Sequence, residues 1–301
     1  MRTSLEFFTI CARNYLSQAA LLAESIREHH PESGLTIWLL DPGDLPEAVS
    51  HLVCRDVSES MDEVEQVELL LRYSILEYST AVKPACFQTH FKEGAKRVVY
   101  LDPDIILFES LRDVERLLDE GHQGVVVPHM NAPFPSDGRF PGDLDILKAG
   151  VFNLGFLALG EHPKTPPFLQ WWWGWLKTHC YSDHSRGVFT DQKWINFVPT
   201  LWPDFGILHH SGYDVAYWNL HERPLSREAG RWMAGSYPLV FFHYSGFTPV
   251  DPTSLSKHQN RFTVTPDTPL AEMLQLVAAK LNGFKFSECS HNSTRRAGAP
   301  R

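Results

Sequence analysis

The chain has 301 residues, of which 43% are hydrophobic and 21% charged. This composition is typical of a folded globular protein and excludes wholesale disorder. Its 27 lysines and arginines against 36 aspartates and glutamates give a net charge of 27 − 36 = −9. Without an overall positive field, general binding to nucleic acid or anionic lipid is not expected.

Cysteine usage and the lack of targeting signals bear on the compartment. The five cysteines are widely spaced and form no C-x-x-C pair, so neither a disulfide framework nor a structural zinc site is predicted. The N-terminus shows no signal-peptide pattern, and no apolar run is long enough for a membrane span. These patterns predict a cytoplasmic protein.

The first half alternates strand and helix patterns. Buried strands are predicted at residues 5–12, 36–40, 51–57, 97–101 and 124–127, and helices at 15–29, 62–78, 81–91 and 108–118. Such an alternation predicts an α/β fold with a mostly parallel central sheet flanked by helices.

The second half is less regular. Residues 130–145 are rich in Pro, Gly and Asp and predict a long loop. After it we expect a strand at 151–159, helices at 167–179, 190–197 and 268–281, and short strands at 206–219, 225–227 and 238–244. Since no repeat or linker is visible, residues 1–285 are predicted to form a single domain and 286–301 a disordered tail.

The sharpest chemical signal is Asp102-Pro103-Asp104, directly after the strand predicted at 97–101. Because Pro103 cannot extend a central ladder, the chain should turn there and present both carboxylates at the carboxyl end of the strand. Ligands bind at that edge in open α/β sheets, and paired carboxylates suit Mg²⁺ or Mn²⁺. The alternative is a simple turn in which one aspartate caps the helix predicted at 108–118.

With this motif the chain resembles GT-A-type nucleotide-sugar glycosyltransferases, in particular the glycogenin-like and bacterial surface-glycan branch. In that family an Asp-x-Asp motif ends a central strand and binds a divalent cation on the donor diphosphate. Further matching segments follow in order between residues 5 and 262: Phe8-Thr9-Ile10-Cys11, Ala81-Val82-Lys83-Pro84, Phe152-Asn153-Leu154-Gly155, Thr190-Asp191-Gln192, Tyr217-Trp218-Asn219 and His243-Tyr244-Ser245-Gly246. The resemblance implies a single GT-A-like (Rossmann-like) domain. It also implies a metal-dependent, hexosyltransferase-like enzyme that uses a nucleoside-diphosphate sugar with retention of configuration.

The resemblance also implies roles for particular residues. They are metal ligation by Asp102, Asp104 and His243, donor binding by Phe8, Thr9, Lys83, Asp102 and Lys257, and catalytic contact with the transferred sugar by Asn153 and Asp191. Asn219 belongs to a polar cluster around Trp218, with Asp214, His221 and Arg223, that is suited to diphosphate or acceptor contact. The Lys-Pro-Trp that often follows the family's late histidine is missing, and Lys257 is expected to take over its diphosphate contact.

Structural alternatives stand beside these roles. His243 could be a core histidine, Lys83 a solvated surface lysine, and Asp191 a first-turn helix acid after Thr190. In the tryptophan run, Trp171, Trp172 and Trp175 would share one helix face while Trp173 points elsewhere. For this run we expect core packing together with a contact in a homo-oligomer.

Two other classes of function stay open. A metal-dependent nucleotidyltransferase or phosphohydrolase should carry a glycine-rich loop after the first strand, but Ala12-Arg13-Asn14-Tyr15 has no glycine. A non-catalytic nucleotide-sugar-binding domain would lack the metal ligands, which are present. The favoured prediction is a Mn²⁺- or Mg²⁺-dependent glycosyltransferase whose sugar and acceptor the sequence does not reveal.

Overall fold

The computed structural model describes residues 4–284. The strands are β1 (Glu6–Cys11), β2 (Leu35–Leu39), β3 (Val53–Asp56), β4 (Arg97–Leu101), β5 (Ile105–Leu107), β6 (Gly124–Pro128), β7 (Phe152–Gly160), β8 (Ser182–Asp183), β9 (Val188–Phe189), β10 (Phe205–Ile207), β11 (Leu225–Glu228), β12 (Arg231–Ala234), β13 (Tyr237–Pro238) and β14 (Phe241–His243). The α-helices are α1 (Leu16–His29), α2 (Glu63–Arg72), α3 (Ile75–Ala81), α4 (Lys83–Lys92), α5 (Arg112–Asp119), α6 (Asp143–Ala149), α7 (Thr165–His179), α8 (Val198–Leu201) and α9 (Pro269–Gly283). Short 3-10 helices include η5 (Gln192–Phe197).

A seven-stranded central sheet has the order β10-β6-β7-β4-β1-β2-β3. Strands β1 to β4 run parallel to one another, whereas β7 runs antiparallel to its neighbours β4 and β6. The predicted α/β fold with a mostly parallel central sheet is therefore confirmed. Because β7 runs the opposite way, its first residues lie at the carboxyl end of β4.

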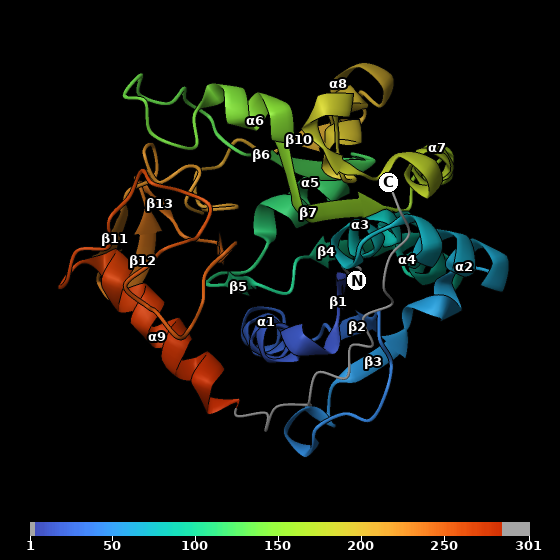
Figure 1. Ribbon diagram of the computed structural model, residues 1–301, viewed down its shortest axis with the longest axis horizontal. Helices are drawn as coiled ribbons and strands as arrows, with labels where there is room; N and C mark the ends of the chain where they lie inside the picture. Colours follow the sequence, from blue (N-terminus) through green and yellow to red (C-terminus); the bar gives the residue numbers. More distant parts are fainter. Residues whose placement is uncertain (1–3, 285–301) are drawn as a thin grey trace.

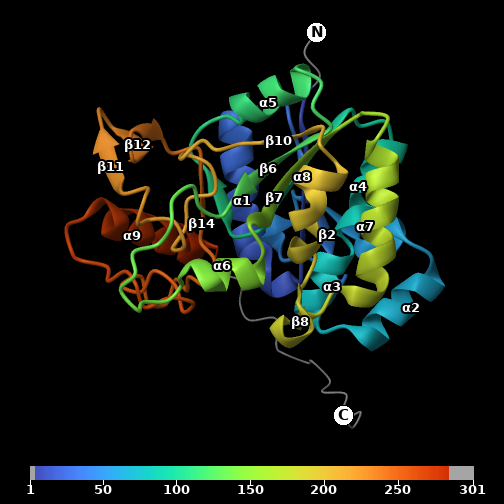
Figure 2. The same cartoon turned by 90° about the horizontal axis from the view of Figure 1, so that it is seen from above.

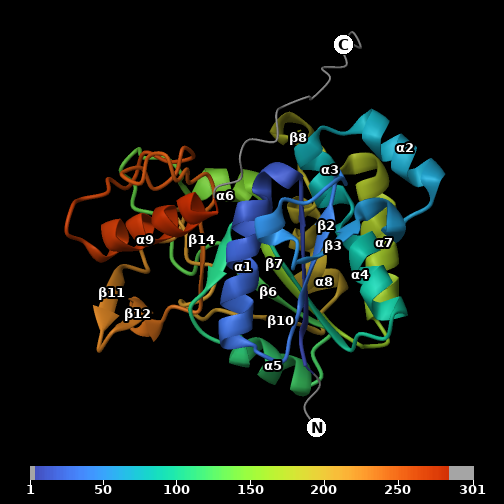
Figure 3. The same ribbon diagram turned by 90° about the horizontal axis from the view of Figure 1, so that it is seen from below.

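Helices cover both faces of this sheet, with α1 on one side and α4 and α7 on the other (Figure 3). Alternate residues of β1 enter different cores: Phe8 and Ile10 pack on the side of α4, and Phe7 and Cys11 on the side of α1. Burial on both faces is the usual environment of parallel strands and explains why they read as continuous apolar runs.

The chain from β11 onward forms a separate layer beside α1 and β5, seen in orange and red in Figures 1 and 2. It contains the antiparallel sheet β11-β12-β13 and helix α9. Strand β14 leaves this layer and pairs antiparallel with β5, with His243 opposite Ile105. This pairing joins the late part of the chain to the segment that follows β4.

Two predicted helices of the first half differ from the structure. The helix predicted at 62–78 is broken into α2 and α3, because the Ser74 side chain and Glu77 form a capping box that starts a new helix. The helix predicted at 108–118 is shorter and is preceded by β5, which forms only because β14 pairs with it. Helix α5 begins after Leu111 without a side-chain cap, so neither motif aspartate caps it.

The second half also departs from the predictions. The segment predicted as a helix at 190–197 is the 3-10 helix η5 followed by α8, and only β10 of the strand predicted at 206–219 is present. Strand β12 was not predicted, and the strand predicted at 238–244 is divided between β13 and β14. The tail predicted at 286–301 lies outside the described residues. Within residues 4–284, no helix is both long and apolar enough to span a bilayer.

The tryptophan run lies on α7 but uses its faces differently from the prediction. Trp172 and Trp173 are both buried, so Trp173 belongs to the core instead of pointing away from it. Trp175 is 40% exposed and stacks on Trp194 with ring centroids 4.6 Å apart. Core packing accounts for Trp172 and Trp173, and the oligomer contact stays a prediction.

Candidate active site

The acidic motif turns sharply at the carboxyl end of β4. The backbone amide of Asp102 donates to the carbonyl of Gly155 on β7, and the carbonyl of Asp104 accepts from the amide of Tyr244 just after β14. Three segments that are far apart in the sequence are thus joined at this turn by main-chain hydrogen bonds. Their arrangement places His243 against both aspartates.

Asp102, Asp104 and His243 form a compact cluster. The His243 Nε2 atom lies 3.1 Å from Asp104 Oδ1 and 3.6 Å from Asp102 Oδ2, and one potential ligand atom from each residue lies within 4.8 Å of the others. Burial by itself would lower the pKa of His243, but Asp104, Asp214 and Asp102 together raise it well above its usual value. A cation bound by these three side chains would displace any proton from the ligating nitrogen of His243, since metal ligands must be deprotonated.

The set of ligand atoms fits a divalent ion. Two carboxylates and one imidazole are hard and intermediate ligands, which suit Mn²⁺ better than the purely oxygen-seeking Mg²⁺. The hydroxyl of Tyr100 donates to Asp102 Oδ1, so this carboxylate is also oriented by the strand that carries it.

Lys83 is buried, and the alternative of a solvated surface lysine is wrong. Its ammonium lies 2.8 Å from Asp191 Oδ2 and 4.0 Å from Asp102 Oδ1, and it donates to the carbonyl of Leu154 at 2.7 Å. Burial raises the pKa of Asp191, although Lys83 opposes the shift. Asp191 is therefore a buried ion-pair partner next to the acidic motif. It stands at the N-cap of η5, without a side-chain capping hydrogen bond, and so is not a first-turn helix acid after Thr190.

Asn153 lies at the start of β7 with a fixed orientation. Its Oδ1 accepts from the amide of Gly155 at 2.8 Å, and its Nδ2 lies 3.2 Å from His129 Nε2. Burial lowers the pKa of His129 to about 3, so that ring is neutral. An amide nitrogen carries two hydrogens, and within residues 4–284 no acceptor other than His129 is found for this nitrogen.

Gly155 shows why Asn-x-Gly occurs here. A Cβ at this position would overlap the His243 ring and would lie 2.7 Å from Asn153 Oδ1. Only glycine lets β7 pass this close to the His243 ring. The segment that carries Asn153 therefore packs directly against the candidate metal ligands.

Other predicted residues lie elsewhere. Phe8 is buried against Phe87, His90 and Tyr100 and lines neither of the two cavities described below. The buried hydroxyl of Thr9 has no hydrogen-bond partner among the described residues. The amide of Asn219 donates to the carbonyls of His129 and Asp214 and accepts from Ala216, so it holds a turn in the interior.

Lys257 is exposed and lines a cavity of about 200 Å³ together with Asp104 and Tyr15. Burial, Asp104 and Asp102 together raise the pKa of Tyr15. Tyr15, His129 and Tyr100 also lie at or beside the compact cluster, and the periodicity of helix and strand offers no signal for them.

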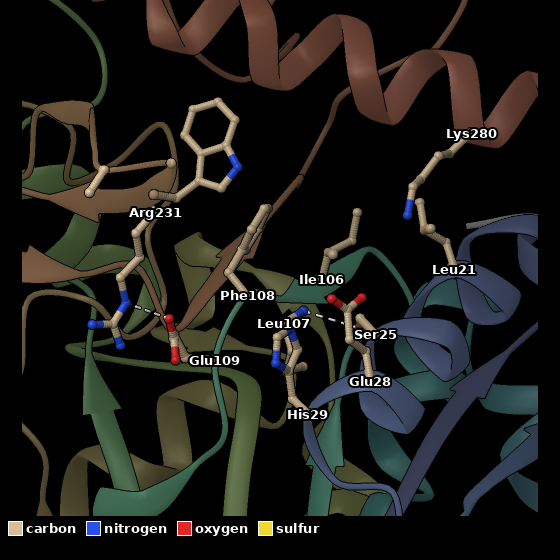
Figure 4. Close-up of a pocket in the computed structure, with 13 residues that line it drawn as sticks. Leu21, Ser25, Glu28, His29, Ile106, Leu107, Phe108, Glu109, Arg231 and Lys280 are labelled. Carbon is tan, nitrogen blue, oxygen red and sulfur yellow. Dashed lines mark hydrogen bonds and ion pairs between the residues drawn. The ribbon is translucent and has the colours of Figure 1, made fainter.

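A larger cavity of about 520 Å³ lies between α1, β5, the β11–β12 turn and α9 (Figure 4). It shares Leu21 and Ile106 with the smaller cavity, and an ion pair between Arg231 and Glu109 lies at one side of it. None of the predicted site residues lines it.

Six of the predicted site residues lie in one contact network, namely Asp102, Asp104, His243, Lys83, Asp191 and Asn153.

The architecture is that of GT-A-type glycosyltransferases, as solved structures show. The galactosyltransferase LgtC, in complex with donor and acceptor sugar analogs, aligns with a TM-score of 0.50 and 14% identity over 91% of this chain and 95% of LgtC. The glycosyltransferase GlyE of Streptococcus pneumoniae aligns with a TM-score of 0.50 and 16% identity over 93% of this chain and 63% of GlyE. The uncharacterized protein YfnD of Bacillus subtilis is 26% identical over 82% of this chain and 79% of YfnD. No protein-family model matches the chain.

Proposed function

We propose that the protein is a metal-dependent glycosyltransferase that moves a hexosyl group from a nucleoside-diphosphate donor to an acceptor, with retention of configuration. The observation that carries this proposal is the cluster of Asp102, Asp104 and His243 at the carboxyl end of β4. Its location matches the edge at which open α/β sheets bind ligands. The fold shared with LgtC and GlyE supports sugar transfer as the reaction.

The leaving diphosphate gains negative charge as the glycosidic bond breaks. A divalent cation held by Asp102, Asp104 and His243 would act as a Lewis acid toward that charge. Lys257 and Tyr15 line the cavity next to Asp104, and we assign the nucleotide portion of the donor to this cavity. Thr9 and Asp102, which do not line it, are proposed as further contacts of the donor.

The sugar gains positive charge in the same step. Asp191 would stabilise this charge electrostatically, because Lys83 holds its carboxylate in one position. Asn153, whose orientation is fixed by Gly155 and His129, would donate its second amide hydrogen to a sugar hydroxyl. In this scheme Lys83 orients Asp191 and does not itself need to reach the diphosphate.

A donor-cleavage screen tests the proposal. The full chain is incubated with UDP-, GDP- and dTDP-sugars in Mn²⁺ or in EDTA, and nucleotides and sugars are separated by chromatography. We expect one nucleoside diphosphate to be released, with Mn²⁺ only, and the configuration at the anomeric carbon of the transferred sugar to be retained.

The products distinguish the rival functions. A phosphohydrolase would cleave within the diphosphate and release a nucleoside monophosphate and a sugar phosphate. A nucleotidyltransferase would transfer the nucleoside monophosphate to an acceptor and release the sugar phosphate, whereas a binding domain would leave the donor intact. Full turnover in EDTA, after metal removal has been verified, would contradict metal dependence.

A further inference from the structure

The carboxylate of Asp214 lies on the side of His243 away from Asp102 and Asp104, and the proposed reaction does not use it. Asp214 is fully buried, and neither of its oxygens has a hydrogen bond of normal geometry within residues 4–284. It forms an ion pair with His243, whose Nδ1 lies 3.5 Å from Asp214 Oδ1. Since burying a carboxylate with so few partners costs free energy, stability alone does not explain this residue.

The backbone holds Asp214 in place from both sides. Its φ angle is +54°, a left-handed conformation that aspartate and asparagine adopt more readily than most residues. The side-chain amide of Asn219 donates to the backbone carbonyl of Asp214 at 2.8 Å. The backbone amide of His243 donates to the backbone carbonyl of Val215 at 2.8 Å. The turn that carries Asp214 is thereby fixed directly to the strand that carries His243.

The two ring nitrogens of His243 face different carboxylates. Nε2 faces Asp102 and Asp104, whereas Nδ1 faces Asp214. The ring of Trp218 packs edge-on against the imidazole, with centroids 5.2 Å apart, and restricts its rotation. A histidine that ligates a metal commonly donates its other N–H to a carboxylate, which fixes its tautomer.

We propose that Asp214 is a positioning residue that accepts the Nδ1–H of His243 and so leaves Nε2 free to bind a divalent cation. This inference rests on the proposed function, because it assigns a partner to one of the proposed metal ligands. It extends the site by one residue that would not touch the donor or the cation.

The inference is tested by measuring the affinity of the full chain for Mn²⁺ alone with electron paramagnetic resonance. Asp214→Asn keeps the size of the side chain and suits the left-handed backbone. We expect it to weaken Mn²⁺ binding roughly 10- to 100-fold while the melting temperature without metal changes by only a few degrees. Tyr213→Phe is the matched control on the same turn, because it removes a hydroxyl that contacts Asp113, and it should bind Mn²⁺ as the wild type does.

A second variant covers the case in which Asp214→Asn folds poorly. Asp214→Gly removes the carboxylate, and glycine accepts a positive φ without strain. At a temperature where circular dichroism shows it folded, it should show the same loss of Mn²⁺ affinity. Wild-type affinity in either folded variant overturns the inference.

The wild type and Asp104→Ala separate the two proposals. If the wild type binds Mn²⁺ and Asp104→Ala does not, an unchanged affinity in Asp214→Asn overturns only the role of Asp214. If the wild type binds no Mn²⁺, both the metal requirement and the role of Asp214 are wrong.

Discussion

Asp104 and His243 illustrate how a short contact arises between residues that the sequence separates widely. The motif aspartates follow β4, and His243 ends β14, whose antiparallel pairing with β5 places the histidine opposite Ile105. The carboxylates come from a local pattern that sequence reasoning can find. Which histidine faces them depends on that strand pairing: His221, from the polar cluster around Trp218, stacks on Phe134 instead.

Asp104→Asn should lower kcat/KM for donor cleavage by about 10²-fold or more, since removing one charge-stabilising group costs on the order of 3 kcal/mol. Steady-state kinetics in saturating Mn²⁺ measures the effect. Asp119→Asn, which changes a carboxylate on α5 that pairs with Arg97, is the control and should keep wild-type rates. Wild-type activity in Asp104→Asn would show that this carboxylate serves only the turn.

Lys83→Met should destabilise the protein by about 3–5 kcal/mol, because it leaves Asp191 as an unpaired buried charge. The double variant Lys83→Met/Asp191→Asn removes both charges and should recover part of that loss. Urea unfolding of the two variants and the wild type measures the difference. Equal stability of the single variant and the wild type would contradict a buried ion pair.

At the scale of elements, the loop predicted at residues 130–145 is irregular only as far as Gly142, because α6 begins at Asp143. This loop is attached to the C-terminal layer. Arg261 donates to Asp137 and to the carbonyls of Arg139 and Pro141, and its guanidinium packs over the Phe134 ring at 4.9 Å. The loop precedes α6 and β7, so its position is coupled to the strand that begins at Phe152.

Arg261→Ala should therefore free residues 130–142. Limited proteolysis should cut this segment several-fold faster in the variant than in the wild type, and mass spectrometry locates the cuts. In the wild type, adding Mn²⁺ and a nucleotide-sugar should slow cleavage if the loop closes over a ligand. Cleavage at the same rate in both proteins would show that Arg261 does not restrain the loop.

At the scale of the whole molecule, buried histidines make stability depend on pH. His30 Nε2 accepts from the amide of Leu111, and His90 Nε2 accepts from the indole N–H of Trp38. Burial lowers the pKa of both rings to about 4, so the folded protein keeps them neutral where the unfolded chain, with a pKa near 6.5, binds protons. Between about pH 6.5 and pH 4 stability should fall as pH falls.

The size of this effect is up to about 1.4 kcal/mol per pH unit for each histidine. Asp191 and Asp214, whose pKa values are raised by burial, act in the opposite direction, because the folded state then binds their protons more readily. These contributions are the same in the wild type and in His90→Gln, so they cancel in the difference between the free energies of unfolding of the two proteins. Urea unfolding from pH 7 to pH 4 should show a shallower decline in His90→Gln, and parallel curves would contradict the assignment.

Local sequence determined much of the fold. The apolar run before Asp102, the helical period of residues 15–29 and the turn imposed by Pro103 each predicted the observed element, because burial period and backbone preference are encoded within a few residues. The same local signals identified the two motif aspartates, whereas the order of the segments around them came from the resemblance to GT-A-type glycosyltransferases.

Tertiary structure decided what depends on contacts between distant segments. Residues 105–107 form a strand only because β14 pairs with them, and Lys83 is buried because Asp191 and the Leu154 carbonyl lie against the start of α4. Gly155 is required by the approach of His243, and Asp214 faces that ring through a turn held by backbone bonds. No local sequence period encodes these tertiary contacts, since they follow from how the sheet, the C-terminal layer and the loops pack together.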